Sequence, residues 1–62
     1  MNCMLVDVIQ NTLANCNYTQ CSAECANFLF NISFNCPVVF HNAKYLELWN
    51  SLIHICFQNN FI

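Results

Sequence analysis

The sequence predicts an all-α fold, a small bundle of three helices over residues 3–15, 19–35 and 43–58. Three observations support this prediction: polar residues recur at helical spacing in each segment, a proline follows the second segment, and the chain contains no glycine. Without glycine, tight hairpin turns of the Asn-Gly type are excluded. The 62 residues form a single small helical domain, 1–62, near the size at which one core is only just sufficient.

The first helix, residues 3–15, is predicted from an apolar stripe that recurs every three or four residues. The stripe contains Leu5, Val8, Ile9 and Leu13. Polar residues occupy the opposite side of this helix, namely Asp7, Gln10, Asn11 and Asn15. The same N-terminal segment has no basic residue and carries an acid inside its apolar run, so it is not typical of a secretory signal peptide.

The second segment contains the stretch NFLFNISFNC, residues 27–36, in which apolar and polar residues alternate as in a strand. A wider window favours a helix, because its polar residues are spaced by four, three, four and four: Gln20, Glu24, Asn27, Asn31 and Asn35. Thr19 or Ser22 is the expected N-cap, and Pro37 ends the helix. The alternative is an α+β fold in which residues 28–40 are extended.

The third helix, residues 43–58, has the clearest pattern of the three. Its polar residues fill one arc of about 120°, and its apolar residues fill the remainder. Asn42 is the expected N-cap. Trp49 lies near the middle of the apolar arc, so it is predicted to be buried and to contribute most to stability.

The composition excludes several classes of function. Charged residues make up 6% of the chain, the net charge is −2, and Lys44 is the only basic residue besides two histidines. Nucleic-acid binding needs a basic patch, so that class is excluded. Glycine-dependent phosphate loops and dinucleotide sites are excluded too, and no cofactor is expected. No segment holds the roughly twenty mostly apolar residues of a transmembrane helix.

Six cysteines allow three interpretations: free buried thiols, disulfides, or a metal site. Free thiols are favoured because four cysteines fall on apolar helix faces, and this interpretation favours an intracellular location over a secreted one. Six cysteines in a secreted chain of this size are instead typical of a disulfide framework, with 15 connectivities. Cys21 and Cys25 share one helix face, so each would need a partner on another element. Two glycosylation sequons, at Asn17 and Asn31, agree with secretion.

The candidate metal ligands are Cys21, Cys25, Cys36 and His41, spaced C-x3-C-x10-C-x4-H. Zinc prefers tetrahedral sets of thiolates and imidazoles, but the usual C-x2-C pair is missing. The simpler interpretation is three core cysteines and a histidine in a linker. Zinc is therefore not assigned as a cofactor.

Catalysis has few candidate residues. The acids Asp7, Glu24 and Glu47 each fall on a polar helix face, where solvated carboxylates are ordinary. His54 and Cys56 are about 200° apart around their helix, so they cannot pair within it. The C-x-x-C motif of thiol exchange is absent. The chain is predicted not to be an enzyme.

The octapeptide YLELWNSL, residues 45–52, places Tyr45, Trp49 and Leu52 at i, i+4 and i+7. It resembles the aromatic-x3-Trp-x2-Leu helix of tumour-suppressor transactivation segments, although this chain has Tyr where that family has Phe. The resemblance implies that the three side chains dock into a hydrophobic groove of a protein partner. The simpler interpretation is that they belong to the core stripe of the third helix.

The predicted function is that of a small, hydrophobic, non-enzymatic helical interaction protein. Each helix is apolar over more of its circumference than a three-helix bundle buries, so the surplus would be covered by a second copy or by a larger protein. A membrane surface is less favoured, because interfacial helices carry Lys and Arg on their polar faces. The alternative is a secreted, disulfide-stapled helical ligand or toxin-like module. A count of free thiols distinguishes the two.

Overall fold

The computed structural model describes residues 3–60 and is all-helical over that range. Three α-helices follow one another along the chain, and a short 3₁₀ helix, η1, stands between the last two: α1 (Leu5–Asn15), α2 (Ala23–Asn35), η1 (Pro37–His41) and α3 (Ala43–Gln58). The predicted three-helix fold is confirmed. The alternative with residues 28–40 extended is wrong, because residues 28–35 belong to α2 and residues 38–40 to η1.

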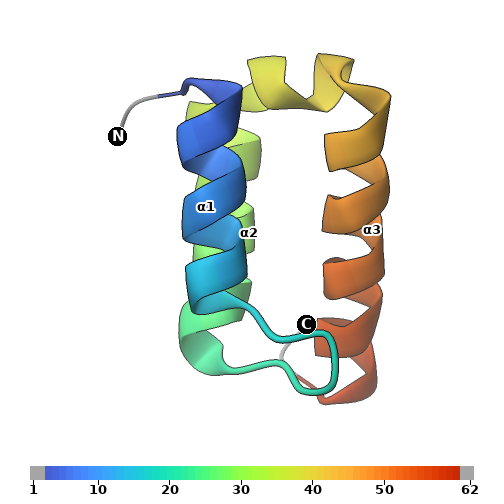
Figure 1. The fold of residues 1–62 in the computed structure, drawn as a ribbon. Helices are drawn as coiled ribbons and strands as arrows, with labels where there is room; N and C mark the ends of the chain where they lie inside the picture. The colour runs from blue at the N-terminus through green and yellow to red at the C-terminus, as the bar shows by residue number, and fades with distance from the viewer. Residues whose placement is uncertain (1–2, 61–62) are drawn as a thin grey trace.

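The helices run alternately up and down (Figure 1). In that view α1 descends, α2 returns beside it, η1 crosses the top, and α3 descends on the far side. The loop that joins α1 to α2, residues 16–22, therefore lies at the same end of the molecule as the last turns of α3. This arrangement brings three separate segments of the chain together at one end.

Two of the predicted N-caps are confirmed. Ser22 Oγ accepts a hydrogen bond from the backbone N–H of Cys25 at 3.2 Å, and Asn42 Oδ1 accepts one from the backbone N–H of Tyr45 at 3.0 Å. The second helix starts later than residue 19, because Thr19 belongs to a turn. Its backbone N–H and its hydroxyl both donate to Asn17 Oδ1, at 2.9 Å and 2.8 Å.

The first helix begins at Leu5 rather than at residue 3, and its buried face differs from the predicted stripe. Val8 is buried as expected, but Leu13 is 50% exposed, and the polar Thr12 is fully buried. Thr12 lies between Leu5 and Val8 around the helix, so it occupies the centre of the buried face. Its hydroxyl needs a buried partner there, and α3 supplies one.

The core has two parts, one at each end of the bundle. The η1-end cluster comprises Val8, Phe28, Ile32, Cys36, Val39 and Tyr45. The loop-end cluster comprises Cys21, Cys25, Ala26, Leu29, Leu52 and Cys56. The partly buried Leu48 and Trp49 pack against both, so the two clusters are joined through the middle of α3.

Trp49 is only partly buried, so the prediction that it is the buried centre of the core is wrong. Tyr45, one turn earlier, is the largest fully buried side chain in residues 3–60. The Trp49 indole N–H keeps a polar contact by donating to the carbonyl oxygen of Leu29 on α2 at 3.1 Å. Phe40 packs edge-on against the indole, with ring centroids 5.2 Å apart. Trp49 thus joins α3 to α2 and η1 at the rim of the core.

A buried hydrogen bond joins α1 to α3. The hydroxyl oxygens of Thr12 and Tyr45 lie 2.9 Å apart, and the Thr12 hydroxyl donates to the Val8 carbonyl oxygen at 2.7 Å. Because Thr12 has a single hydroxyl proton, the Tyr45 phenol must be the donor between the two side chains. Burial raises the pKa of the Tyr45 phenol above its ordinary value, so the phenol remains protonated at neutral pH.

Candidate functional site

All six cysteines form disulfides: Cys3–Cys36, Cys16–Cys25 and Cys21–Cys56. The interpretation of the cysteines as free buried thiols is therefore wrong. That interpretation considered each helix by itself, in which a buried thiol and half of a disulfide occupy the same apolar positions. The expectation that Cys21 and Cys25 bond to other elements is confirmed.

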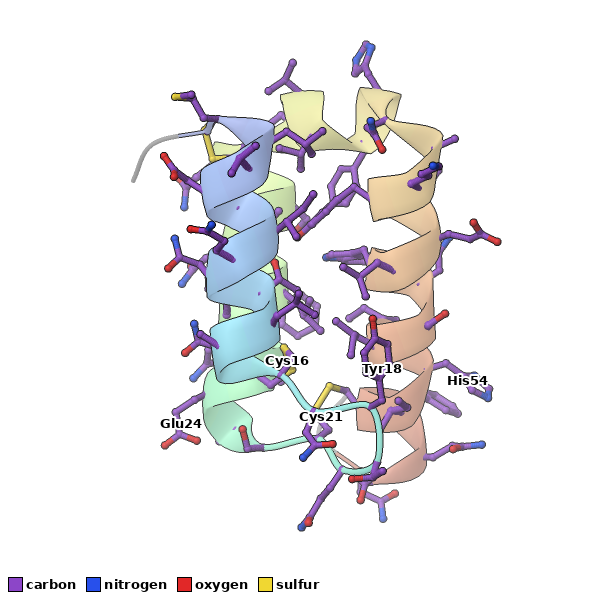
Figure 2. The ribbon with its side chains drawn as sticks, viewed as in Figure 1. Cys16, Tyr18, Cys21, Glu24 and His54 are labelled. Carbon is purple, nitrogen blue, oxygen red and sulfur yellow. A yellow bond between two sulfur atoms is a disulfide. The ribbon has the colours of Figure 1, made fainter. Side chains whose placement is uncertain are left out.

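Two of the disulfides lie at the loop end of the bundle. Cys16 follows the last residue of α1 and bonds to Cys25 in the first turn of α2, with 4.9 Å between their Cα atoms. Cys21 precedes α2 and bonds to Cys56 near the end of α3, with 4.8 Å between their Cα atoms. The first bond joins α1 to α2, and the second joins the loop to α3 (Figure 2).

These two disulfides form one compact group of four sulfur atoms. The Sγ atoms of Cys21, Cys25 and Cys56 all lie within 4.8 Å of one another, and Cys16 is bonded to Cys25. Cys21, Cys25 and Cys56 are buried, and their neighbours in the loop-end cluster are apolar. Together, Cys16, Cys21, Cys25 and Cys56 make up the sulfur cluster of the loop end.

A cavity of about 460 Å³ opens beside the sulfur cluster. It is lined by the end of α1 and by the loop: Leu13, Ala14, Asn15, Cys16, Asn17, Gln20, Cys21 and Ser22. Cys16 and Cys21 contribute one residue of each loop-end disulfide to its wall, and Cys16 is partly exposed. Each loop-end disulfide therefore contributes one cysteine to the lining of this open pocket.

No family model, curated protein or solved structure matches this chain. None of the helices described between residues 3 and 60 is both long enough and apolar enough to cross a membrane.

The structure does not bring the candidate metal ligands together: Cys21, Cys25, Cys36 and His41. Cys36 bonds to Cys3 and belongs to the η1-end cluster, and His41 is exposed at the end of η1. Cys21 and Cys25 lie instead with Cys16 and Cys56, which their spacing in the sequence did not group with them. The available signal was the expectation that Cys21 and Cys25 each need a partner on another element, although Cys21 precedes α2 in the structure.

The candidate acid–base residues lie apart on the surface. Glu24 and His54 project from outer faces of α2 and α3, away from the helix interfaces (Figure 2). The His54 imidazole has a local partner, with its Nε2 atom 3.2 Å from the Gln58 side-chain nitrogen one turn later. Glu47 is also exposed, and Asp7 is partly exposed.

The proposed docking triplet faces the inside of the molecule. Tyr45 and Leu52 are buried, and Trp49 is partly buried with its indole N–H bonded to α2. A partner would reach these three side chains only if α3 left the other helices. The candidate glycosylation residues are both exposed, Asn17 in the loop and Asn31 within α2.

Proposed function

We propose that this chain is a non-enzymatic, disulfide-stapled helical binding module that works in an oxidising environment, as secreted proteins do. The observation that carries the proposal is that every cysteine is paired and that the bonds reach all three α-helices or their flanking residues. Small secreted domains depend on such bonds because their cores are too small to suffice, whereas the cytosol keeps thiols reduced.

The exposed apolar side chains support a role in binding other proteins. Nine large apolar side chains are exposed in residues 3–60, on every helix and in the loop: Met4, Val6, Leu13, Tyr18, Phe30, Phe34, Val38, Leu46 and Phe57. Phe34 is the most exposed of them, at 81%. Only 6% of the residues are charged, so few charged side chains lie among these exposed apolar ones. Association with a protein partner or a second copy is therefore favoured.

A disulfide map tests the oxidising environment. The chain is expressed through the secretory pathway of a eukaryotic host, denatured in an alkylating agent without reductant, and analysed by mass spectrometry. We expect no alkylated cysteine and, after proteolysis, the pairs Cys3–Cys36, Cys16–Cys25 and Cys21–Cys56. Six alkylated cysteines in protein isolated from its native source would refute the proposal.

Sedimentation across a dilution series tests the binding role. We expect the oxidised chain either to self-associate or to bind a dye for exposed apolar surface. Phe34→Asn should reduce the self-association or the amount of bound dye. Asn31→Ala is the matched control, because it changes an exposed polar residue on the same helix. A chain that stays monomeric and binds no dye would contradict this part of the proposal.

A further inference from the structure

An uncovered apolar face begins on α2, on the side of that helix opposite α1. α1 packs against Phe28 and Ile32 of α2, which share the η1-end cluster with Val8. Phe30 lies about 160° from both of these residues around α2, so its ring projects away from α1. Phe30 and Phe34, one turn later, are both exposed. In Figure 1, α1 stands in front of α2, so this face lies on the far side of the molecule.

The face continues across α3. Tyr45 bonds to α1, whereas Trp49, about 40° further around α3, donates its indole N–H to α2. Beyond Trp49 in the same direction, by about another 40–80°, come three apolar residues that are exposed or partly buried: Ile53, Leu46 and Phe57. The contact of Trp49 with α2 separates these residues from α1, so they lie on the same side of the helix pair as Phe30. We call this surface the α2–α3 face: Phe30, Phe34, Leu46, Trp49, Ile53 and Phe57.

Among residues 3–60, the α2–α3 face contains no charged side chain. Asp7 is on α1, and the other three charged residues lie at least about 80° from the residues of the face around their own helices: Glu24, Lys44 and Glu47. The neutral amides of Asn27 and Asn50 are exposed at its edges. Two copies of the face can therefore meet without bringing like charges together, whereas a charged partner would find no opposite charge on it.

The exposed area of the α2–α3 face matches what a dimer needs. A phenylalanine side chain can bury about 200 Å², so Phe30, Phe34 and Phe57, at 38%, 81% and 63% exposure, present about 350 Å². The other residues of the face bring its apolar area to about 500 Å². Two such faces together bury about 1,000 Å², the area at which specific interfaces between proteins begin. A second copy of the chain therefore suffices to cover the face.

We propose that two copies of the oxidised chain pair through their α2–α3 faces as a two-fold symmetric dimer. The helices α2 and α3 of both copies then form a four-helix bundle, and each α1 lies on its outside. Along α3 the central residues recur at i, i+4, i+7 and i+11, which is the spacing of a seam between paired helices: Leu46, Asn50, Ile53 and Phe57. This inference rests on the proposed function as a binding module and names a second copy as the partner.

Two double variants of matched exposure test which face is used. Leu46→Asn/Phe57→Asn changes the α2–α3 face at residues that are 40% and 63% exposed. Leu13→Asn/Val6→Asn changes the outer side of α1 at residues that are 50% and 61% exposed. Self-association of each oxidised chain is measured by sedimentation equilibrium, after circular dichroism and a disulfide map have verified the fold. Acrylamide quenching of Trp49, the only tryptophan, reports on the face of the wild-type chain without any substitution.

We expect the wild type and the α1 variant to form dimers, and the quenching of Trp49 to fall as the concentration of the chain rises. The dimer of the α2–α3 variant should dissociate with a Kd about 10-fold higher or more, since two apolar contacts are lost from each copy. Equal Kd values for the two variants, assemblies larger than a dimer, or quenching that does not depend on concentration would overturn the proposal.

A second readout separates this inference from the proposed function. A wild-type chain that stays monomeric but binds a dye for apolar surface would overturn the dimer and leave the binding role intact, with a different protein as the partner. A chain that stays monomeric and binds no dye would contradict both.

Discussion

Tyr45 shows how a single polar atom restricts which residue a helix can bury. Its ring is 1% exposed, and its hydroxyl reaches Thr12, whose own proton is donated to the Val8 carbonyl. Trp49 offers a larger ring, but its indole N–H finds its acceptor on α2 at the edge of the core. A fully buried polar group needs such a partner, so Thr12 and Tyr45 depend on each other.

The raised pKa of Tyr45 gives the protein an alkaline limit. Between the ordinary phenol pKa of 10.0 and the higher pKa in the folded state, the unfolded chain loses this proton while the folded chain keeps it. The free energy of unfolding should therefore hold its full value below about pH 10 and fall as the pH rises further. Urea unfolding across that range measures the fall.

Two conservative variants identify the source of the alkaline loss. Tyr45→Phe removes the buried phenol, so its stability should fall less steeply above about pH 10. Tyr18→Phe changes an exposed tyrosine in the loop and should keep the steeper decline of the wild type. If both variants follow the same pH profile, the buried phenol is not the titrating group.

Trp49 should contribute to stability without being indispensable. Trp49→Ala removes contacts with both core clusters and the hydrogen bond to Leu29, at a cost of about 3 kcal/mol, the low end of the range for such truncations. The three disulfides add to the stability of the core, so the variant should still fold. The measurement is its unfolding midpoint in guanidinium chloride under non-reducing conditions.

Asn31→Ala provides the matched control for Trp49→Ala. Asn31 is exposed in the middle of α2, and alanine is the better helix former, so the free energy of unfolding should stay within about 0.5 kcal/mol of the wild type or rise slightly. Equal midpoints for Trp49→Ala and the wild type would mean that the indole contributes little at the rim of the core.

At the scale of the elements, short-range chemistry determines where helices begin and end. Ser22 and Asn42 each satisfy a backbone N–H at a helix start, and Pro37 begins η1 directly after α2 has ended. After α3, Asn60 adopts a positive φ of 64°, a conformation usually taken by glycine, which this chain lacks. Each of these features depends on residues within about four positions of one another.

The two glycosylation sequons lie in different kinds of backbone, although both asparagines are exposed. Asn17 is exposed in the loop between α1 and α2, whereas Asn31 lies within the regular backbone of α2. Sequons that carry glycans are typically in surface loops, so we expect modification at Asn17 and not at Asn31 in a folded chain that passes through the secretory pathway.

Gel mobility before and after treatment with a glycosidase measures this difference. Asn17→Gln should abolish the mobility shift, and Asn31→Gln should leave it unchanged. A shift that persists in Asn17→Gln and disappears in Asn31→Gln would place the glycan on the helix and contradict the prediction.

At the scale of the whole molecule, the disulfides contribute unequally to the free energy of unfolding. Cys21–Cys56 spans 35 residues and Cys16–Cys25 spans 9. In the chain-entropy model the longer link restricts the unfolded chain more, by about 1 kcal/mol. For a domain of this size, that difference corresponds to roughly 4–8 °C in the thermal midpoint.

The paired deletions Cys21→Ala/Cys56→Ala and Cys16→Ala/Cys25→Ala measure this difference by thermal unfolding without reductant. The first pair should unfold at the lower temperature. Cys21 and Cys56 are both buried, whereas Cys16 is partly exposed, so the loss of packing acts in the same direction as the loop length. The reverse order would show that contacts within the loop outweigh the entropy of the unfolded chain.

The sequence by itself determined the helical class, the number of helices, their approximate ranges and two of their caps. These features follow from the spacing of polar residues and from local backbone hydrogen bonds, which can be recognised within a short window. The sequence also indicated that Cys21 and Cys25 would need partners on other elements, although Cys21 precedes α2 in the structure and the two bond to different segments.

Only the tertiary structure decided how the cysteines pair, that Thr12 replaces Leu13 in the core, and that Tyr45 rather than Trp49 is fully buried. Each outcome depends on atoms that are distant along the chain and adjacent in space, such as the Thr12 and Tyr45 hydroxyls. The sulfur cluster is of the same kind, because its four residues meet only when the loop, α2 and α3 pack together. Helical periodicity describes one element at a time, and such contacts arise between elements.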